Sequence, residues 1–330
     1  MADPLLSAVR ISLLVLCMSS AARSDFQTLH VRDLHWIRWV IPATMILILE
    51  IASKNAGMSN ICMTAALLAV FSFCFYTPPN PSKIREWRWM DALLASICIL
   101  GIGGIIGGAI TYSQTNFIDL VLGEEDPNTT LWWSMVGATV TATIFYLSWR
   151  IGLIQGGADV KALILVTIFF PSWAFVPEQA FPLVDDPIFR MPPSMVLFIW
   201  AAAAFLVAPP VIFAQNATKG NIKSFPDLKM AWHATKREIT ELKEMSRMTD
   251  NANWILTDLI QKDGKMTVVN RILPSRNSTL VTDKSRHLEA LEELGTESVW
   301  IASKHPFIVY LFLAILPMLI LGDPLSFLIR

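Results

Sequence analysis

Apolar residues in this chain fall in long runs that are separated by shorter polar stretches. A run of about 18 or more apolar residues is long enough to cross a hydrocarbon core roughly 30 Å thick. Such runs recur along most of the sequence. We therefore predict about eight transmembrane helices, at residues 5–22, 36–53, 57–77, 91–113, 131–149, 161–179, 194–214 and 305–322.

The composition indicates the same class of protein. Of 330 residues, 54% are hydrophobic and 16% are charged, whereas soluble domains average about 25% charged residues. A chain so poor in charge lacks the polar side chains needed to cover a water-exposed surface.

The net charge of -1 argues against nucleic acid as a partner. The four cysteines lie in apolar runs without CxxC spacing, so we expect no disulfide framework, no metal site and no cofactor.

The distribution of cations predicts the orientation in the membrane. Cytoplasmic connections are enriched in lysine and arginine, and the connection 114–130 has neither but contains four acidic residues. Arg10 and Lys54 run against the pattern. With the N-terminus outside the cell, the cytoplasmic connections hold Arg23, Arg32, Lys83, Arg85, Arg88, Arg150 and Lys161. We predict a multi-pass protein of the cytoplasmic membrane in this orientation.

The interval 216–303 differs in character from the rest of the chain. Apolar residues at helical spacing among many charges predict a helix around 226–248, and 283–294 shows a similar pattern. Residues 264–269 are typical of a short turn and strand. We predict an α+β cytoplasmic insert at 216–303, between a transmembrane bundle at 1–215 and a final transmembrane helix at 304–330.

The fourth apolar run contains a cluster of glycines. Small residues spaced four apart let helices approach closely within lipid. We therefore expect these residues to pack against a neighbouring helix rather than to bind a ligand: Gly101, Gly103, Gly104, Gly107 and Gly108.

Two aspartates stand out by their positions. A carboxylate inside or at the rim of a membrane helix is costly, which makes it a functional candidate. Asp25 follows the first predicted span, and Asp159 precedes the sixth. Four predicted spans separate them, and an even number of crossings returns the chain to the same face. Both aspartates are therefore expected on the cytoplasmic side at a similar depth.

A pair of carboxyl groups suits peptide hydrolysis without a metal. When they lie close together, both do not ionise easily, so they share one proton. One then accepts a proton from water and the other donates one to the carbonyl oxygen. Gly156 and Gly157 have no Cβ, which would let a substrate strand approach the backbone.

Simpler interpretations of these residues remain open at this stage. Asp159 can be a helix N-cap, and Asp25 can be an ordinary residue of a polar loop. Asp33 is expected to be solvated, and Asp91 to start a helix. Lys161 can orient the loop, pair with an aspartate, or extend along the membrane rim as a simple surface cation.

The stretch Gly156-Gly157-Ala158-Asp159-Val160-Lys161 resembles the active-site signature of archaeal type IV prepilin and preflagellin peptidases, within the GxGD aspartyl protease group. Ser24-Asp25-Phe26-Gln27-Thr28 resembles the first aspartate segment of that family. The C-terminal segment with Pro306-Phe307 and Gly322-Asp323-Pro324-Leu325 is also similar. The strict pattern has glycine where this chain has Ala158.

The resemblance implies a membrane aspartic endopeptidase that cleaves class III signal peptides of pilin or archaellin precursors at the cytoplasmic face. It implies Asp25 and Asp159 as the catalytic pair. It also implies that the substrate leader lies along Gly156, Gly157 and Ala158, near Lys161. Two other functions fit the apolar composition: a transporter, in which interrupted helices bind substrate, and an inactive scaffold with the same fold.

Overall fold

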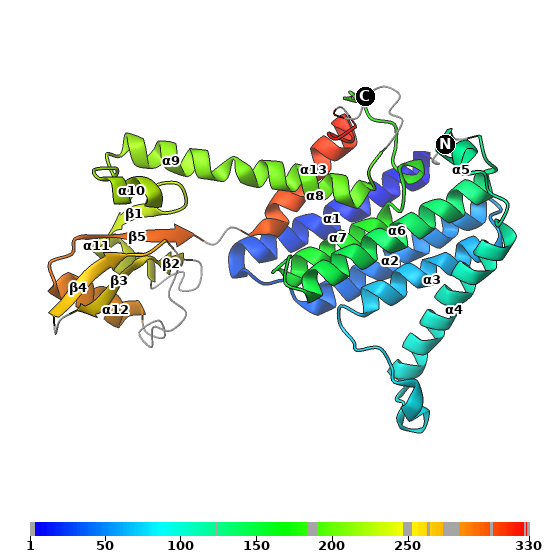
Figure 1. Ribbon diagram of the computed structural model, residues 1–330, viewed down its shortest axis with the longest axis horizontal. Helices are drawn as coiled ribbons and strands as arrows, with labels where there is room; N and C mark the ends of the chain where they lie inside the picture. The colour runs from blue at the N-terminus through cyan, green and yellow to red at the C-terminus, as the bar shows by residue number, and fades with distance from the viewer. Residues whose placement is uncertain are drawn as a thin grey trace. The chain divides into compact units, whose positions relative to one another are not determined.

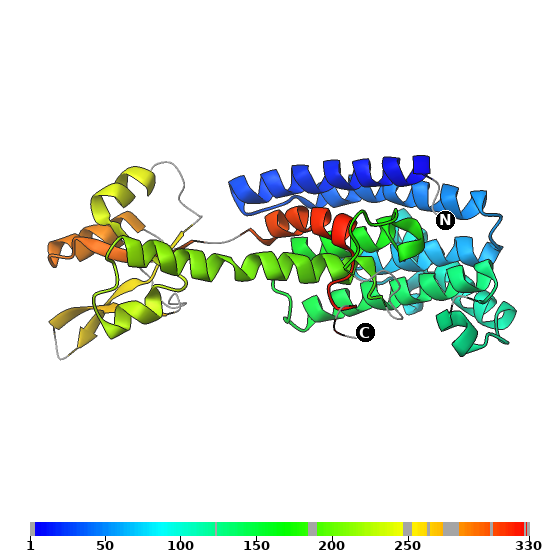
Figure 2. The ribbon, with the colours of Figure 1, turned by 90° about the horizontal axis from the view of Figure 1, so that it is seen from above.

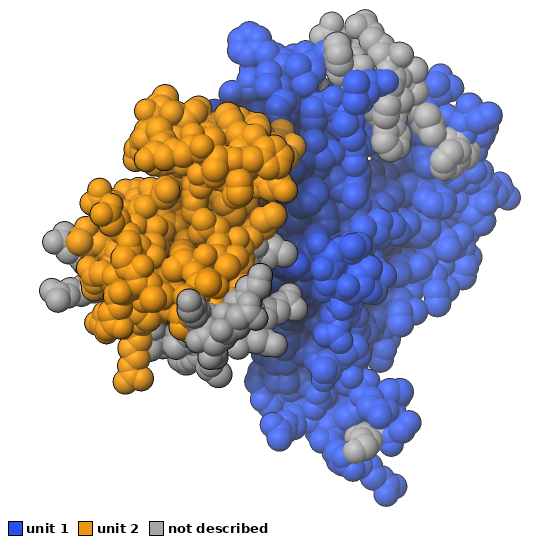
Figure 3. All heavy atoms as spheres, turned by 60° about the vertical axis from the view of Figure 1, so that its left-hand side comes forward, with its two compact units in different colours: residues 1–202, 307–330 blue, residues 203–306 orange. Residues whose placement is uncertain are grey.

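The computed structural model describes residues 4–122, 124–183, 190–246, 253–262, 265–272, 284–303, 306–326 and 328. The chain divides into two compact units (Figure 3). Unit 1 comprises residues 1–202 and 307–330, and unit 2 comprises residues 203–306. The predicted boundaries were 216 and 303, so unit 2 takes in an additional stretch of helix at its start.

Unit 1 is a helical bundle (Figures 1 and 2). Five helices of the described chain are long and apolar enough to cross a membrane, the last of them continuing into unit 2, which supports a membrane-embedded protein. They are α1 (Pro4–Thr28), α2 (Asp33–Ser53), α4 (Trp89–Thr111), α6 (Pro127–Arg150) and the run Pro193–Thr218, formed by α8 (Pro193–Leu206) and α9 (Ala208–Thr218). Two shorter apolar helices are α3 (Met58–Ser72) and α13 (Phe307–Leu321). The predicted total of eight spans stays a prediction.

The helix α7 (Gly157–Phe169) forms the centre of the bundle. Each of its residues from Val160 to Phe169 is buried, and the helix contacts α1, α2, α3, α6 and α13. The predicted span 161–179 is wrong in its second half, because the α-helix ends at Phe169. Pro171 follows closely: it has no N–H to donate, and it disfavours helical geometry at Phe170. After a bend, the 3₁₀ helix η2 occupies Trp173–Phe175.

Two glycines of α4, Gly101 and Gly104, pack against α3 as expected, and Gly108 packs against Trp132 of α6. A Cβ built on Gly101 would lie 2.7 Å from the Cα of Ala66, and one on Gly104 would lie 2.7 Å from the backbone nitrogen of Met63. The expectation is wrong for Gly103, which has open space around it because it lies on a face of α4 that meets no other helix of the described chain. The short elements η1 (Pro81–Glu86) and α5 (Phe117–Leu122) flank α4 in sequence.

A buried ion pair explains the two cations that oppose the charge pattern. Arg10 on α1 donates to Glu50 on α2 over 2.5 Å, and neither side chain is exposed. Lys54 reaches the other carboxylate oxygen of Glu50 at 3.1 Å. Phe175 lies beneath both cations, 4.8 Å from the Arg10 guanidinium and 4.7 Å from the Lys54 ammonium. Glu50 therefore compensates one of the two positive charges inside the protein, and the Phe175 ring lies against both cations.

Unit 2 combines two small antiparallel sheets with helices. One sheet has the order β1-β5-β2, and the other pairs β3 with β4. Apolar side chains of α11, α12 and β5 form one of its cores, with Leu288, Leu291 and Val299 among them. The elements are α10 (Phe225–Met230), β1 (Thr235–Glu238), α11 (Ile239–Ser246), β2 (Asn253–Ile255), β3 (Thr257–Lys262), β4 (Lys265–Asn270), α12 (Lys284–Glu293) and β5 (Ser298–Ser303).

The predicted helix at 226–248 is wrong in its middle. Strand β1 interrupts it between α10 and α11. The register pairs Thr235 with Ile301 and Glu238 with Ser298, so a partner about 60 residues later in the chain overrides the local helical pattern. The strand predicted at 264–269 matches β4 and the helix predicted at 283–294 matches α12, while Gly264 and Asp283 lie outside the described residues.

Candidate active site

Three helix ends meet at one end of unit 1. The last turn of α1 and the first turns of α7 and α13 lie at the same end of the bundle in both ribbon views (Figures 1 and 2). The helices α1, α7 and α13 contact one another in pairs. Asp25 belongs to the first of these ends and Asp159 to the second, so the fold places both predicted catalytic residues in one region.

The Asp25 carboxylate is buried, with 8% of the residue exposed. The chain around Asp25 is held by two hydroxyls. Ser24 Oγ and Thr28 Oγ1 each donate to the carbonyl of His30 at 2.9 Å. The polar residues on either side of Asp25 thus hold the turn that ends α1.

The Asp159 carboxylate lies against Gly156. A Cβ built on Gly156 would be 1.9 Å from Asp159 Oδ2, so any larger residue there would overlap the carboxylate. The φ of Gly156 is −85° and its ψ is 103°, values that any L-residue adopts. Glycine is therefore required at position 156 because a side chain there would overlap the Asp159 carboxylate, and not because of the backbone conformation. At Gly157, the nearest atom to a built Cβ is Cζ2 of Trp149, at 3.3 Å.

Asp25 and Asp159 are close enough for their charges to interact. Asp159 precedes the predicted span 161–179 and lies outside the five long helices. Burial is the main cause that raises the pKa of the Asp159 carboxyl to about 7, and the negative charge of Asp25 acts in the same direction. Burial and a nearby negative charge both favour the neutral form of a carboxyl group.

Lys161 pairs with Asp33 rather than with Asp25 or Asp159. Its Nζ donates to Asp33 Oδ1 at 2.6 Å and lies 4.7 Å from the centre of the Phe75 ring. Asp33 was expected to be solvated. Its side chain is 62% exposed, yet it holds this ion pair, which joins α2 to α7. Lys161 is itself buried and so is not a rim cation.

The other acidic candidates have structural partners. Asp91 accepts a hydrogen bond from the backbone N–H of Arg88 at 2.9 Å and starts α4, which confirms the prediction that it begins a helix. Glu50 is bound to Arg10. Neither acid therefore competes with Asp159 as the partner of Asp25. Between the glycine pair and Asp159, Ala158 is half-buried and packs against the bundle core.

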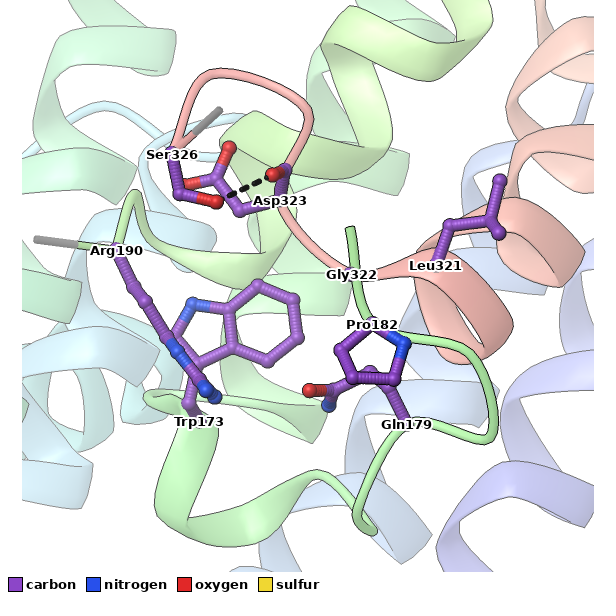
Figure 4. Close-up of a pocket in the computed structure, with 8 residues that line it drawn as sticks. All are labelled: Trp173, Gln179, Pro182, Arg190, Leu321, Gly322, Asp323 and Ser326. Carbon is purple, nitrogen blue, oxygen red and sulfur yellow. Dashed lines mark hydrogen bonds between the residues drawn. The ribbon is translucent and has the colours of Figure 1, made fainter. Parts of the chain in front are cut away.

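The Gly322-Asp323-Pro324-Leu325 motif stabilises the opposite end of α13. Gly322 has a φ of 77°, which favours glycine. Asp323 accepts from the backbone N–H of Met191 at 2.7 Å and of Leu325 at 2.9 Å. Figure 4 shows Asp323 and Ser326, whose Oγ donates to the Asp323 carbonyl at 2.7 Å, beside a small pocket near Trp173 and Gln179. This motif therefore closes a loop and does not reach the aspartate pair.

Among the described residues, no group of three or more histidine, cysteine, aspartate or glutamate side chains is arranged to hold a metal ion.

No protein-family model matches this chain, and no curated protein is significantly similar to it.

Proposed function

We propose that this protein is a membrane aspartic endopeptidase with Asp25 and Asp159 as its catalytic pair. The observation that supports the proposal is that the end of α1 and the start of α7, which carry these two residues, lie at one end of the bundle, where the charge of Asp25 acts on Asp159. They come from helices separated by 128 residues of chain at their nearest ends (157 minus 29), and no sequence-local requirement brings them together. Asp33, Asp91 and Asp323 each have a cation or a backbone N–H as partner, whereas Asp159 is influenced by the charge of another acid, Asp25.

The pair can hydrolyse a peptide bond by general acid–base catalysis. The carboxylate takes a proton from water, whose oxygen attacks the scissile carbonyl carbon. The protonated carboxyl donates its proton to the carbonyl oxygen, which gives a neutral tetrahedral diol. When the C–N bond breaks, the leaving nitrogen takes a proton from the first carboxyl and the second regains one from a diol hydroxyl. Water is consumed, and the pair returns to its starting state.

We further propose that the substrates are precursors of archaeal pilins or archaellins with class III signal peptides. Such a precursor has a short basic leader followed by an apolar helix. The apolar helix would lie in the bilayer beside unit 1, and cleavage would occur at the boundary between leader and helix. The proposed orientation, with the N-terminus outside the cell, puts the aspartate pair at the cytoplasmic face of the cell membrane.

Gly157 and Ala158 are suited to bind the leader through their main chain. They are the first two residues of α7, and the first N–H groups of an α-helix have no acceptor within the helix. An extended leader can offer its carbonyl oxygens to them. Gly156 contributes by leaving space for Asp159. Lys161 contributes indirectly, since its pairing with Asp33 fixes α7 to the start of α2.

A cleavage assay with purified protein in lipid nanodiscs tests the proposal. Wild type, Asp25→Asn and Asp159→Asn are mixed with a panel of pilin and archaellin precursors, and products are identified by mass spectrometry. We expect cleavage by wild type and a loss of at least 1000-fold, on the order of general acid–base contributions, in each variant.

The control is Asp91→Asn, which removes a charge at a helix start outside the site. It should cleave like wild type. Cleavage that survives Asp25→Asn or Asp159→Asn would refute the pair. No cleavage by wild type, combined with Asp159-dependent solute uptake into proteoliposomes, would favour a transporter.

A further inference from the structure

One segment of unit 2 combines exposed aromatic and basic side chains. Phe225 is 70% exposed and Trp232 is 47% exposed. Three exposed lysines accompany them: Lys219, Lys223 and Lys229. The one acid between residues 219 and 232 is Asp227, which accepts hydrogen bonds from Ser224 Oγ at 2.7 Å and from the backbone N–H of Lys223 at 3.3 Å. Residues 219–232, the lysine–aromatic segment, therefore present apolar rings within an excess of positive charge.

The lysine–aromatic segment begins where a candidate membrane span ends. That span is the run Pro193–Thr218, and no charged residue lies between Arg190 and Lys219 in the sequence. Residues 195–214 are all apolar or proline, and as a helix they measure about 30 Å, which is the thickness of the hydrocarbon core. Lys219 therefore follows closely after the point at which the helix leaves the hydrocarbon.

Contacts within unit 2 hold the other end of the segment at the same level. The Phe213 ring, at the end of the apolar run, stacks on the Trp232 ring with 4.3 Å between the ring centres. The buried Asn216 donates from Nδ2 to the carbonyls of Ala231 at 3.0 Å and Ala234 at 2.7 Å. Helix α10 accordingly lies beside the last turns of α9 in both ribbon views (Figures 1 and 2). Trp232 thus lies at the depth where the span leaves the hydrocarbon, and tryptophan is enriched at that depth in membrane proteins.

The larger sheet of unit 2 indicates the same direction. Strand β1 begins at Thr235, shortly after Trp232, and Thr235 pairs with Ile301 of β5. Strand β5 ends at Ser303, shortly before the apolar helix α13 starts at Phe307. The chain therefore enters unit 2 from one apolar helix and leaves it towards another at the end of the sheet that lies next to Trp232.

We propose that the lysine–aromatic segment docks on anionic lipid headgroups of the leaflet from which α9 emerges. The three lysines bind headgroup phosphates, and the rings of Phe225 and Trp232 enter the headgroup region. The excess of lysine suits an anionic membrane surface, and the stacking of Trp232 on Phe213 fixes the segment at that surface. An acidic protein partner would satisfy the charge but would not account for this fixed depth. The inference does not rest on the proposed function.

Fluorescence quenching by labelled lipids tests the docking in the full chain. A fluorescent aromatic amino acid replaces Phe225 or, as the matched control, Leu294. Leu294 is also exposed, but it precedes Ser298, at the opposite end of β5 from Ser303. The protein is placed in nanodiscs of phosphatidylcholine alone or of an equal mixture with phosphatidylglycerol, and a small share of the lipids carries a nitroxide quencher on the headgroup.

The first comparison is between lipids and between label positions. We expect strong quenching of the label at 225 in the anionic nanodiscs and severalfold weaker quenching in the neutral ones, because only the anionic surface attracts the lysines. The label at 294 should be quenched little in either lipid. Equal quenching at 225 in the two lipids, or equal quenching at 225 and 294, would overturn the proposal.

The second comparison changes the lysines. The triple variant Lys219→Gln, Lys223→Gln and Lys229→Gln removes three charges, each worth roughly a fivefold change in affinity for an anionic surface, so the ratio of docked to undocked protein should fall by about 100-fold. Quenching at 225 should then drop to the level seen in neutral lipid, whereas arginine at the same three positions should preserve it. Thermal unfolding checks that each variant is folded, and unchanged quenching in the folded glutamine variant would refute the docking.

Two further results keep the test decisive. If the glutamine variant does not fold, the comparison of the two lipids with the native lysines still decides the proposal. None of these measurements requires precursor cleavage, so the docking is decided even if the wild-type protein proves not to be a peptidase.

Discussion

Gly156→Ala separates two explanations of the glycine pair at the site. If the glycines only let a substrate strand approach, alanine at 156 and alanine at 157 should weaken cleavage to a similar extent and mainly through KM. If Gly156 instead makes space for the catalytic carboxylate, alanine there should act on kcat. The structure favours the second explanation, since the space beside Gly156 is occupied by Asp159.

The size of the effect follows from the geometry. A Cβ at 156 would lie 1.9 Å from Asp159 Oδ2, and real Cβ contacts shorter than 3.0 Å are essentially never seen. The carboxylate must therefore move by about 1.1 Å or more (3.0 minus 1.9). A misplacement of about 1 Å can cost on the order of 100-fold in rate, so we expect kcat to fall by about that factor in Gly156→Ala.

Gly157→Ala is the matched control. Its new Cβ would be 3.3 Å from Cζ2 of Trp149, which requires a shift of only a few tenths of an ångström. Alanine also favours the helix start relative to glycine. We expect kcat within about fivefold of wild type, given the roughly 100-fold scale of a full ångström displacement.

The assay measures initial cleavage rates in nanodiscs below pH 7, with thermal unfolding as the folding control. Equal losses of kcat in the two variants would refute the argument from space. Unchanged kcat in a folded Gly156→Ala protein would mean that the Asp159 carboxylate does not act from the observed position.

Three other predictions concern the site and the bundle. Because the pKa of Asp159 is raised to about 7, its proton is present below that pH and lost above it, so cleavage should decline as pH rises through 7; a rate that increases up to pH 9 would contradict its role as the acid. Glu50→Gln leaves Arg10 buried without a counter-ion, which should cost roughly 3–5 kcal/mol of stability and lower the thermal unfolding midpoint; an unchanged midpoint would show that the pair is dispensable. Gly104→Val should disrupt the packing of α4 on α3, because even its Cβ would meet backbone at 2.7 Å, whereas Gly103→Val has open space; equal expression and unfolding midpoints for the two would disprove the difference between the faces.

Local pattern was enough to predict much of the architecture. The assignment to membrane proteins follows from the apolar runs alone. The length of each run is matched to the thickness of the bilayer, and this match does not depend on contacts with other parts of the chain. The packing role of the α4 glycines and the elements β4 and α12 follow from equally local signals. Parity of crossings further predicted that Asp25 and Asp159 lie on one side of the membrane, an argument that needs only the number of spans between them.

The failures of the sequence predictions have two causes. The overlong span at 161–179 overlooked Pro171, a local signal that stops α7. The error in the helix predicted at 226–248 has a different cause. Strand β1 forms by pairing with β5, and the sequence of residues 235–238 does not indicate that partner. Backbone pairing across about 60 residues depends on the fold of unit 2 as a whole.

The partners of the site residues were decided by tertiary structure. Lys161 had three possible roles in the sequence, and its pairing with Asp33 depends on how α2 packs against α7. The meeting of the last turn of α1 with the first turn of α7 likewise depends on how these helices pack against each other. A sequence pattern shows which polar groups are available. The distances between these groups determine their hydrogen bonds and electrostatic interactions, and those distances depend on how helices far apart in the chain pack together.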